Sequence, residues 1–169
     1  HPADAVNALI MAPTRELAKQ IDQALQGFSY YLNVNGVAVY GGNDGERYEQ
    51  ERRSLKQGAD IVIATPGRLI THLQLGSLDL SRTTHLILDE ADRMLDMGFY
   101  DDIMKIVNEM PKERQTILFS ATMPDKINEM AKTIMRNPVE VKLAVSKPAE
   151  NIDQSVYRCY DKDKTGIVQ

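Results

Sequence analysis

The residues best suited to chemistry form a short acidic run, Asp89–Asp92, directly after the apolar segment His85–Leu88. A carboxylate at the end of a buried strand is well placed to hold Mg²⁺, usually through water, beside the phosphates of a nucleotide. The next side chain, Glu90, could accept a proton from an attacking water molecule. Acidic residues at the start of a helix also complement the helix dipole. The run by itself therefore leaves a catalytic and a purely structural interpretation open.

Four other polar motifs in the sequence also follow apolar segments. They are Pro13–Leu17, Gly41–Gly42, Thr65–Arg68 and Ser120–Thr122. The first and the third combine a hydroxyl group, the free amides of a helix start and an arginine, which together suit phosphate oxygens. The glycine pair lets a ligand approach the backbone closely. Each motif alone is explained at least as well by helix capping or a turn, so only a shared position would indicate a site.

The elements that must position these motifs are predicted from hydrophobic periodicity. Short apolar segments typical of strands alternate with amphipathic segments typical of helices. The predicted strands are residues 8–11, 36–40, 60–64, 85–88, 116–119 and 139–143. This alternation predicts an α/β fold with an open, mostly parallel sheet and helices on both faces. In such sheets ligands bind at the carboxyl ends of the strands, which is where all the motifs are predicted to lie.

Composition limits the classes of protein to which the chain can belong. It has 169 residues, 43% of them apolar, which suits one compact domain. Its formal net charge of −4 argues mildly against nucleic acid as a partner, although a phosphate chain responds to the local charge of one face. No apolar run is long enough to cross a bilayer, so we expect no membrane association. The single cysteine, Cys159, and the scattered histidines indicate neither a disulfide nor a metal cluster and favour a cytoplasmic location.

The carboxyl-terminal part of the sequence predicts the beginning of a second domain. Residues 1–144 are predicted to form the first domain, and residues 145–153, which are polar and contain Pro148, a linker. Residues 154–160 alternate between polar and apolar like a strand. We therefore interpret residues 154–169 as the start of a further domain that is cut short.

In their types, order and spacing, the motifs resemble those of the DEAD-box RNA helicases of superfamily 2, and the resemblance covers essentially the whole chain. The matching segments are Pro13–Ala18 with Gln20 (motif Ia), Gly41–Gly42 (the glycine doublet), Thr65–Arg68 (motif Ib), Asp89–Phe99 (an extended motif II) and Ser120–Thr122 (motif III). Their details are most similar to bacterial members. The resemblance implies that the sheet belongs to the first RecA-like domain of such a helicase.

The resemblance also implies a role for each motif. Asp89 would bind Mg²⁺ through water and Glu90 would activate the hydrolytic water, with ATP as the nucleotide. Asp92 would connect to Ser120 and Thr122 and couple the nucleotide to the RNA. The RNA sugar–phosphate backbone would be held by Pro13, Thr14, Arg15, Gly41, Gly42, Thr65, Pro66, Gly67 and Arg68. Such contacts position a strand without reading its sequence, and contacts to 2′-hydroxyls would favour RNA over DNA.

The sequence departs from the family in one respect that bears on catalysis. No Gly-x-x-x-x-Gly-Lys-Ser/Thr phosphate loop occurs in it, whereas the resemblance implies such a loop before Ala8. The adenine-reading Q motif and most of a second domain, with its arginine finger, are missing as well. We therefore expect a chain truncated before motif Ia that binds neither ATP nor Mg²⁺ and does not measurably hydrolyse ATP.

The missing loop also has a consequence for the sheet. In the family, the strand of that loop lies between the strand that ends at Ser120 and residues 139–143, so its absence predicts open strand edges. The two strands could close up, residues 154–160 could fill the slot, or two chains could pair or exchange segments as a homodimer. We expect one of the last two arrangements.

Two functions from different classes follow from these observations. The favoured one is the first half of an ATP-dependent RNA helicase that couples ATP hydrolysis to RNA binding and local duplex unwinding. The alternative is a non-hydrolysing RNA- or protein-binding module. A translocase that acts on DNA is disfavoured by the family-specific run Ala91–Leu95.

Overall fold

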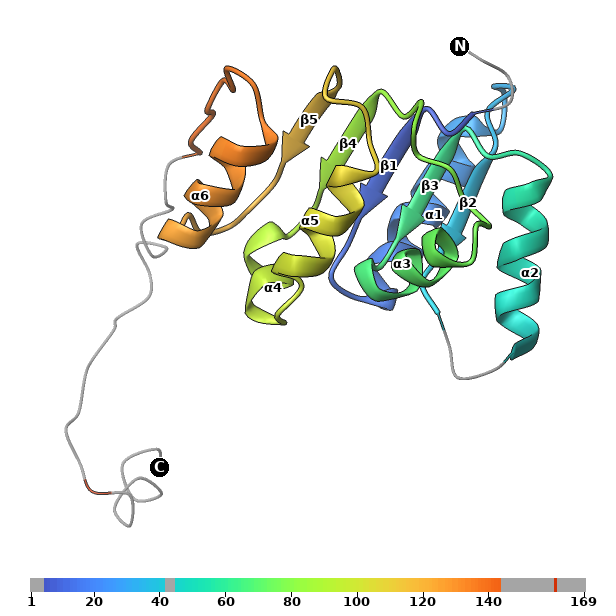
Figure 1. The fold of residues 1–169 in the computed structure, drawn as a ribbon, viewed down its shortest axis with the longest axis horizontal. Helices are drawn as coiled ribbons and strands as arrows, with labels where there is room; N and C mark the ends of the chain where they lie inside the picture. The colour runs from blue at the N-terminus through green and yellow to red at the C-terminus, as the bar shows by residue number, and fades with distance from the viewer. Residues whose placement is uncertain (1–4, 42–44, 144–159, 161–169) are drawn as a thin grey trace, which may run out of the picture. The chain divides into compact units, whose positions relative to one another are not determined.

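The computed structural model describes residues 5–41, 45–143 and 160. The strands are β1 (Ala8–Met11), β2 (Gly36–Val39), β3 (Ile61–Ala64), β4 (His85–Leu88) and β5 (Gln115–Leu118). The helices are α1 (Arg15–Ser29), α2 (Gly45–Lys56), α3 (Pro66–Gln74), α4 (Ala91–Asp96), α5 (Tyr100–Asn108) and α6 (Asp125–Ile134). Figure 1 shows the strands side by side, with the helices around them. Among the described residues, no helix combines the length and the apolar character needed to cross a membrane.

The strands form one parallel sheet in the order β2-β3-β1-β4-β5. All five lie within one residue of their predicted bounds. The predicted fold class, an open parallel α/β sheet with helices on both faces, is therefore confirmed. Each strand is only four residues long, so every strand end lies close to the edge of the sheet.

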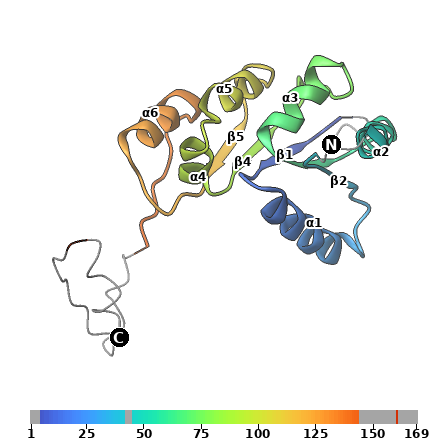
Figure 2. The same cartoon turned by 90° about the horizontal axis from the view of Figure 1, so that it is seen from below.

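Two apolar cores hold the helices against opposite faces of the sheet (Figure 2). The larger core buries Leu9, Leu86 and Leu88 of the sheet together with apolar side chains of α3, α4, α5 and α6. The smaller core is formed by α1, which covers Ile63 and neighbouring side chains on the other face. The sheet is thus covered by helices along its whole width on one face and only in part on the other.

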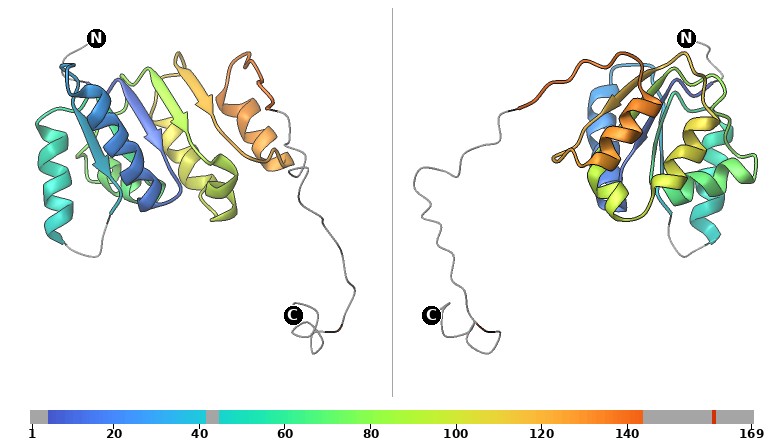
Figure 3. Two further views of the ribbon diagram at one scale, coloured as in Figure 1. Left: turned by 180° about the vertical axis from the view of Figure 1, so that it is seen from behind. Right: turned by 60° about the vertical axis from the view of Figure 1, so that its left-hand side comes forward.

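On the partly covered face, a row of isoleucines shows where the cover by α1 ends. The strand register places Ile63, Ile10, Ile87 and Ile117 side by side in a single row across β3, β1, β4 and β5. Ile63 lies under α1 and is fully buried, whereas Ile117 is 36% exposed. Seen from behind in Figure 3, α1 lies over the β2–β3 side of the sheet and leaves β4 and β5 in view. This face of β5 is therefore open among the described residues.

One predicted strand, residues 139–143, does not form. These residues follow the compact unit that ends at Asn137, and they have neither helix nor strand structure. Val139, Val141 and Leu143 are all at least 80% exposed. The alternating sequence was read correctly as amphipathic, but a strand also needs a partner for its backbone groups. Closing-up of this segment against β5, the one of the three arrangements that was not expected, is not seen among the described residues.

The two expected arrangements remain predictions. Residues 145–153 and 154–159, which were assigned to the linker and to the orphan strand, lie outside the described residues, as do residues 161–169. Tyr160 is described and is not part of a strand. Pairing between two chains is not tested by a single chain.

The unequal cover of the isoleucine row can be tested by two matched truncations. Ile63→Ala should lower the free energy of unfolding by about 2–4 kcal/mol, because it leaves a cavity under α1. Ile117→Ala should lower it by about 1 kcal/mol or less, because this side chain already contacts solvent. Urea unfolding followed by circular dichroism measures both. Equal losses would mean that another segment or a second chain covers β5.

Candidate functional site

All the motifs lie at one edge of the sheet. Neighbouring strands end level with one another, since Met11 pairs with both Ala64 and Leu88, and Leu118 and Val39 complete the same row. The residues that follow each strand therefore emerge along a single rim, as Figure 1 shows at the arrowheads. The strand order also sorts them. The three arginine- and glycine-containing motifs follow the adjacent strands β2, β3 and β1, and the two acidic and hydroxyl motifs follow β4 and β5.

The acidic half of the rim is built around a sharp turn after β4. Asp89 still belongs to the sheet edge, because its backbone N–H donates to the carbonyl of Met11 at 2.9 Å. Glu90 then adopts a left-handed conformation with φ 50° and ψ 52°, which is uncommon and strained for a residue other than glycine. Helix α4 begins immediately afterwards. The strained residue is the predicted general base, and its conformation turns the chain so that both carboxylates remain at the rim.

The carboxylates of Asp89 and Glu90 are placed differently. Asp89 Oδ1 accepts the N–H of Glu90 at 2.9 Å, and no hydrogen bond to its other oxygen is present among the described residues. Glu90 forms an exposed ion pair with Arg93, with 3.3 Å between Oε2 and Nη1. A single free carboxylate oxygen at a strand end fits the way Mg²⁺ is usually held, by one or two carboxylates together with water and substrate phosphates. No group of three or more ligating side chains is found in the described part of the chain.

Asp92 joins the acidic motif to the loop after β5. Its Oδ2 accepts both the backbone N–H of Thr122 at 2.9 Å and the hydroxyl of Thr122 at 2.7 Å. Its own N–H donates to the Ser120 hydroxyl at 3.2 Å, and that hydroxyl donates to the carbonyl of Thr122 at 2.7 Å. The contact expected between Asp92, Ser120 and Thr122 is therefore present. Its role in coupling stays a prediction.

The hydrogen bonds to Asp92 also set its protonation. Partial burial raises the pKa of Asp92, but the hydrogen bonds from Thr122, from the N–H of Arg93 and from Ser120 outweigh it, so the pKa lies below the usual value for an aspartate. The carboxylate is thus ionised at neutral pH, when it can accept all of these donors.

On the other half of the rim, Gly41 connects the three remaining motifs. Its φ of 71° lies in the region that favours glycine. Its N–H donates to Glu51 Oε1 at 3.3 Å, and its carbonyl accepts from Arg15 Nη1 at 3.5 Å. A Cβ atom at this position would lie 3.5 Å from the side-chain carbons of Arg68. Its partner in the doublet, Gly42, lies outside the described residues.

The hydroxyl and amide groups expected to contact phosphate are only partly available. Thr14 uses its hydroxyl to cap α1 by accepting the N–H of Leu17 at 3.3 Å. Thr65 is the N-cap residue of α3, but its hydroxyl makes no capping hydrogen bond. No atom lies within 4 Å of where a Cβ of Gly67 would be, so the backbone there is open to a ligand. At this helix start, the hydroxyl of Thr65 is therefore not used for capping.

Two of the residues expected to contact RNA, Pro13 and Pro66, have buried side chains. Each shapes the turn that leads from a strand into a helix, for which the fixed φ of proline is suited. Their expected contact with RNA stays a prediction.

Arg68 is also turned towards the interior. Its side chain is 17% exposed, and its Nε donates to Glu51 Oε2 at 2.7 Å. Glu51 lies on α2, is 5% exposed and also accepts from His72 Nε2 at 3.0 Å. Burial raises the pKa of Glu51, but the hydrogen bonds from His72, Arg68 and Gly41 lower it by a larger amount. The pKa therefore lies below the usual value for a glutamate, and the carboxylate is held ionised.

The sequence analysis missed Glu51 because it lies in a strongly charged helix. The signal was its spacing, since Tyr48, Glu51 and Leu55 share the inward face of α2. A carboxylate on that face needs a buried cation, and Arg68 was the candidate on the next helix.

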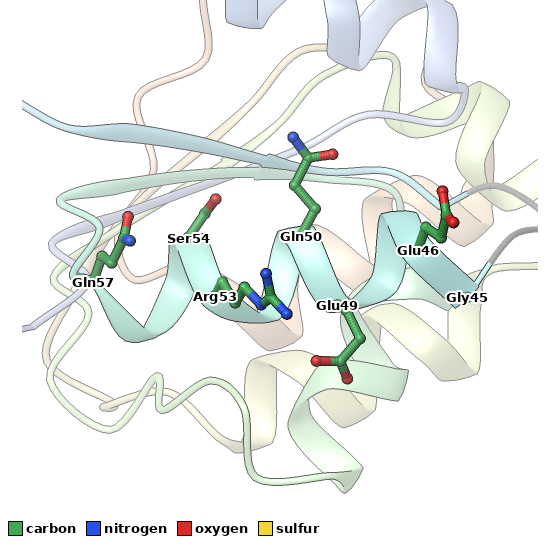
Figure 4. A pocket seen from close by; sticks show the side chains of 7 residues that line it. All are labelled: Gly45, Glu46, Glu49, Gln50, Arg53, Ser54 and Gln57. Atoms are coloured by element: carbon green, nitrogen blue, oxygen red, sulfur yellow. The ribbon is translucent and has the colours of Figure 1, made fainter.

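One surface depression among the described residues contains none of the rim motif residues. It runs along the outer face of α2 and is lined by Gly45, Glu46, Glu49, Gln50, Arg53, Ser54 and Gln57. Figure 4 shows that the labelled residues lie along α2 and at Gln57, which directly follows it, and that their side chains point to different sides of the helix. Because it is open and contains no motif residue, we do not assign a function to it.

Comparison with known proteins relates this geometry to other chains. The family model for the DEAD/DEAH box helicases matches residues 1–130. The ATP-dependent RNA helicase DeaD of Buchnera aphidicola is 44% identical over 169 residues, which cover 98% of this chain and 27% of that protein. The ATP-dependent RNA helicase CshA of Listeria monocytogenes is 45% identical over 164 residues, which cover 96% of this chain and 31% of that protein. The chain spans about a quarter to a third of the length of these relatives.

A solved structure is similar as well. The crystal structure of a DEAD box protein from the hyperthermophile Methanococcus jannaschii matches with a TM-score of 0.74 and 40% identity. The match covers 79% of this chain and 36% of that one.

The hydrogen-bonded position of Asp92 predicts an acid-dependent effect of Asp92→Asn. An amide has one acceptor oxygen, so it cannot accept both the donors of Thr122, which bind Oδ2, and the N–H of Arg93, which binds Oδ1. The free energy of unfolding should therefore fall by about 1–2 kcal/mol at neutral pH. The pKa of Asp92 is lower in the folded than in the unfolded chain. Its contribution is therefore fully present above about pH 5 and is lost as the pH falls through the folded value. Urea unfolding should show the stabilities of the two chains converging as the pH falls below the ordinary pKa of an aspartate.

The matched control is Asp96→Asn, which removes an exposed carboxylate at the end of the same helix. It should leave the free energy of unfolding nearly unchanged. A gap between the parent chain and Asp92→Asn that does not depend on pH would contradict the account.

Proposed function

The chain belongs to the DEAD/DEAH box helicase family, and from this premise we propose that its rim is one half of the working surface of an ATP-dependent RNA helicase. The β2, β3 and β1 side of the rim would hold the RNA backbone, and the β4 and β5 side would face ATP and Mg²⁺. The fold is the RecA-like α/β arrangement found in a DEAD box protein of known structure. The relatives named above are described as ATP-dependent RNA helicases.

The observation that carries this proposal is the separation of charge along the rim. Arg15 and Arg68 follow β1 and β3, whereas Asp89, Glu90 and Asp92 follow β4. The charge of Arg68 is balanced by Glu51, so the glycine-containing stretch presents Arg15 as an exposed cation beside the acidic stretch, although the whole chain has a net charge of −4. Nucleic acid responds to the local charge, and Mg²⁺ with a nucleotide responds to the carboxylates.

On the RNA side, we propose contacts from backbone and short polar groups more than from base-reading side chains. Thr14, Arg15, Gly41 and Thr65, with the start of α3 at Gly67 and Arg68, would follow consecutive phosphates and sugars; Gly42 would belong to the same stretch. Such contacts carry no sequence preference. The buried prolines of two of these motifs would fix the turns.

On the nucleotide side, we propose that Asp89 holds Mg²⁺ through water and that Glu90 takes the proton of the attacking water. Asp92 would couple the nucleotide side to the Ser120–Thr122 loop. The phosphate loop that supplies most of the contacts to ATP in the family is not among the 169 residues. We therefore propose that these residues by themselves neither bind nor hydrolyse ATP, and that catalysis belongs to a longer protein in the cytoplasm.

Two further proposals depend on separate features. The open edge and partly uncovered face of β5 support pairing between two chains, in which case the apparent stability would rise with protein concentration. The alternative function, a non-hydrolysing RNA- or protein-binding module, is supported only by the missing phosphate loop. An assay of a longer protein that contains this chain distinguishes the helicase from the binding module, because only the helicase would release phosphate in the presence of RNA.

The RNA-binding side predicts a defined effect of Arg15→Ala. Removal of one exposed cation from the rim should weaken binding of a single-stranded RNA about three- to tenfold and reduce the slope of log affinity against log salt by about one. The effect should be similar for RNAs of different sequence. Fluorescence anisotropy with a labelled oligonucleotide measures it.

Arg53→Ala is the control, because it removes the same charge from the exposed side of α2, away from the rim. Equal losses for the two substitutions would indicate non-specific attraction. No RNA binding by the unsubstituted chain would contradict the proposal.

The nucleotide side predicts that this chain has no measurable ATPase activity. With ATP, Mg²⁺ and RNA present, the 169-residue chain should release phosphate no faster than the uncatalysed background, because the main contacts to the phosphates are missing. A coupled phosphate assay measures the rate. RNA-stimulated release that Glu90→Gln abolishes would show that the chain has a complete site.

A further inference from the structure

We propose that Glu51 is a positioning residue for nucleic-acid binding, which holds the Gly41 turn and Arg68 in one fixed arrangement. The proposal rests on the proposed function of the rim as an RNA-binding surface. Glu51 lies outside all the motifs and at a distance along the chain from each of them, so no pattern in the sequence assigns it a role.

The geometry that supports this role is a single carboxylate shared by several elements. Oε1 accepts the N–H of Gly41, which follows β2, at 3.3 Å. Oε2 accepts from Nε of Arg68 at 2.7 Å and from Nε2 of His72 at 3.0 Å, and both of these belong to α3. Because Glu51 itself lies on α2, its side chain ties two helices and a turn to one point directly beneath the rim.

The surroundings leave the carboxylate little freedom. Glu51 is 5% exposed and His72 is fully buried. The His72 ring stacks on Tyr48 with 4.6 Å between centroids and 12° between planes, and the Tyr48 hydroxyl lies 3.3 Å from that of Ser77. Since an ionised carboxylate only accepts hydrogen bonds, Nε2 of His72 must carry the proton. The acceptor geometry of Glu51 is thus fixed by its neighbours.

Loss of this carboxylate would free the groups that it holds, among them the Gly41 turn and Arg68. The Gly41 N–H would lose its acceptor, and the largely buried guanidinium of Arg68 would lose its counter-charge. One further nitrogen of Arg68, Nη2, is already buried without a partner in the described part of the chain, so the side chain would favour a turn towards solvent. The Gly41 turn and the start of α3 would then move independently, and an RNA strand that contacts both would have to order them on binding.

Two substitutions separate the reach of the side chain from its charge. Glu51→Gln keeps the length and an acceptor oxygen but removes the charge. Glu51→Asp keeps the charge but withdraws the carboxylate by one methylene group, so it no longer spans Gly41 and Arg68. If Glu51 acts by positioning, both substitutions should lower RNA affinity by about tenfold or more, because Gln has one acceptor oxygen and cannot hold Gly41 and Arg68 together, and Asp does not reach both. A role through charge alone would leave Glu51→Asp with parent-like affinity.

Leu55→Ala is the matched structural control. Leu55 lies one turn further along α2, is 8% exposed and packs into the main core. Its truncation destabilises the same helix without touching the carboxylate cluster. RNA affinity of the folded Leu55→Ala chain should stay within about twofold of the parent, by the same anisotropy measurement at about 50 mM salt.

A second readout does not require RNA. Amide hydrogen exchange followed by NMR should show faster exchange at Gly41 in Glu51→Asp, by about tenfold or more, with no change in β1. It should show little change at Gly41 in Leu55→Ala.

Three results would overturn the inference. The first is parent-like affinity and parent-like Gly41 exchange in Glu51→Asp. The second is an equal loss of RNA affinity in Glu51→Asp and Leu55→Ala, which would show a general effect of stability. The third is altered Gly41 exchange with unaltered RNA affinity, which would reduce Glu51 to a structural residue. Failure of the unsubstituted chain to bind RNA would instead overturn the proposed function itself, and with it this consequence.

Discussion

The constraint on which the rest of the structure depends is the parallel alignment of short strands that end at one level. Met11 of the middle strand is in register with the last residue of both neighbours. Every loop that leaves a strand at this end therefore starts from the same line. Residues more than a hundred positions apart in the chain, from Pro13 to Thr122, become neighbours on one rim without a direct bond to each other. The order of the strands then decides which of them lie side by side.

Alignment of the strands brings the loops together, but it does not fix them relative to one another. Two carboxylates do so in this structure, one for each half of the rim. Asp92 fastens the loop after β5 to the start of α4, and Glu51 fastens the turn after β2 to α3. Both are held ionised by donors from neighbouring segments. The same device serves the side that would face nucleotide and the side that would face RNA, and it limits how far either loop can move alone.

The sequence was sufficient to predict the strands and the shared rim, because both depend on local patterns of apolar and polar residues. Runs such as Leu86–Leu88 predict buried strands by composition alone, and parallel order follows from the helices between them. Other features depend on partners that a local pattern does not contain. Residues 139–143 alternate like a strand, but no neighbouring strand pairs with them in the described part of the chain. Glu51 was missed because its helix is strongly charged, although its spacing from Tyr48 and Leu55 placed it on the inward face. The inward direction of Arg68 follows from Glu51 and was missed with it.

The central claim is that the rim after β2, β3 and β1 is the surface that meets RNA. The most direct measurement is a titration of isotope-labelled protein with a short single-stranded RNA, followed by the NMR shifts of the backbone amides. The account predicts that the largest shifts fall on Thr14, Arg15, Gly41 and the start of α3 at Thr65–Arg68, with smaller ones at the Ser120–Thr122 loop. Shifts concentrated on the outer face of α2, or spread evenly over the surface, would contradict it.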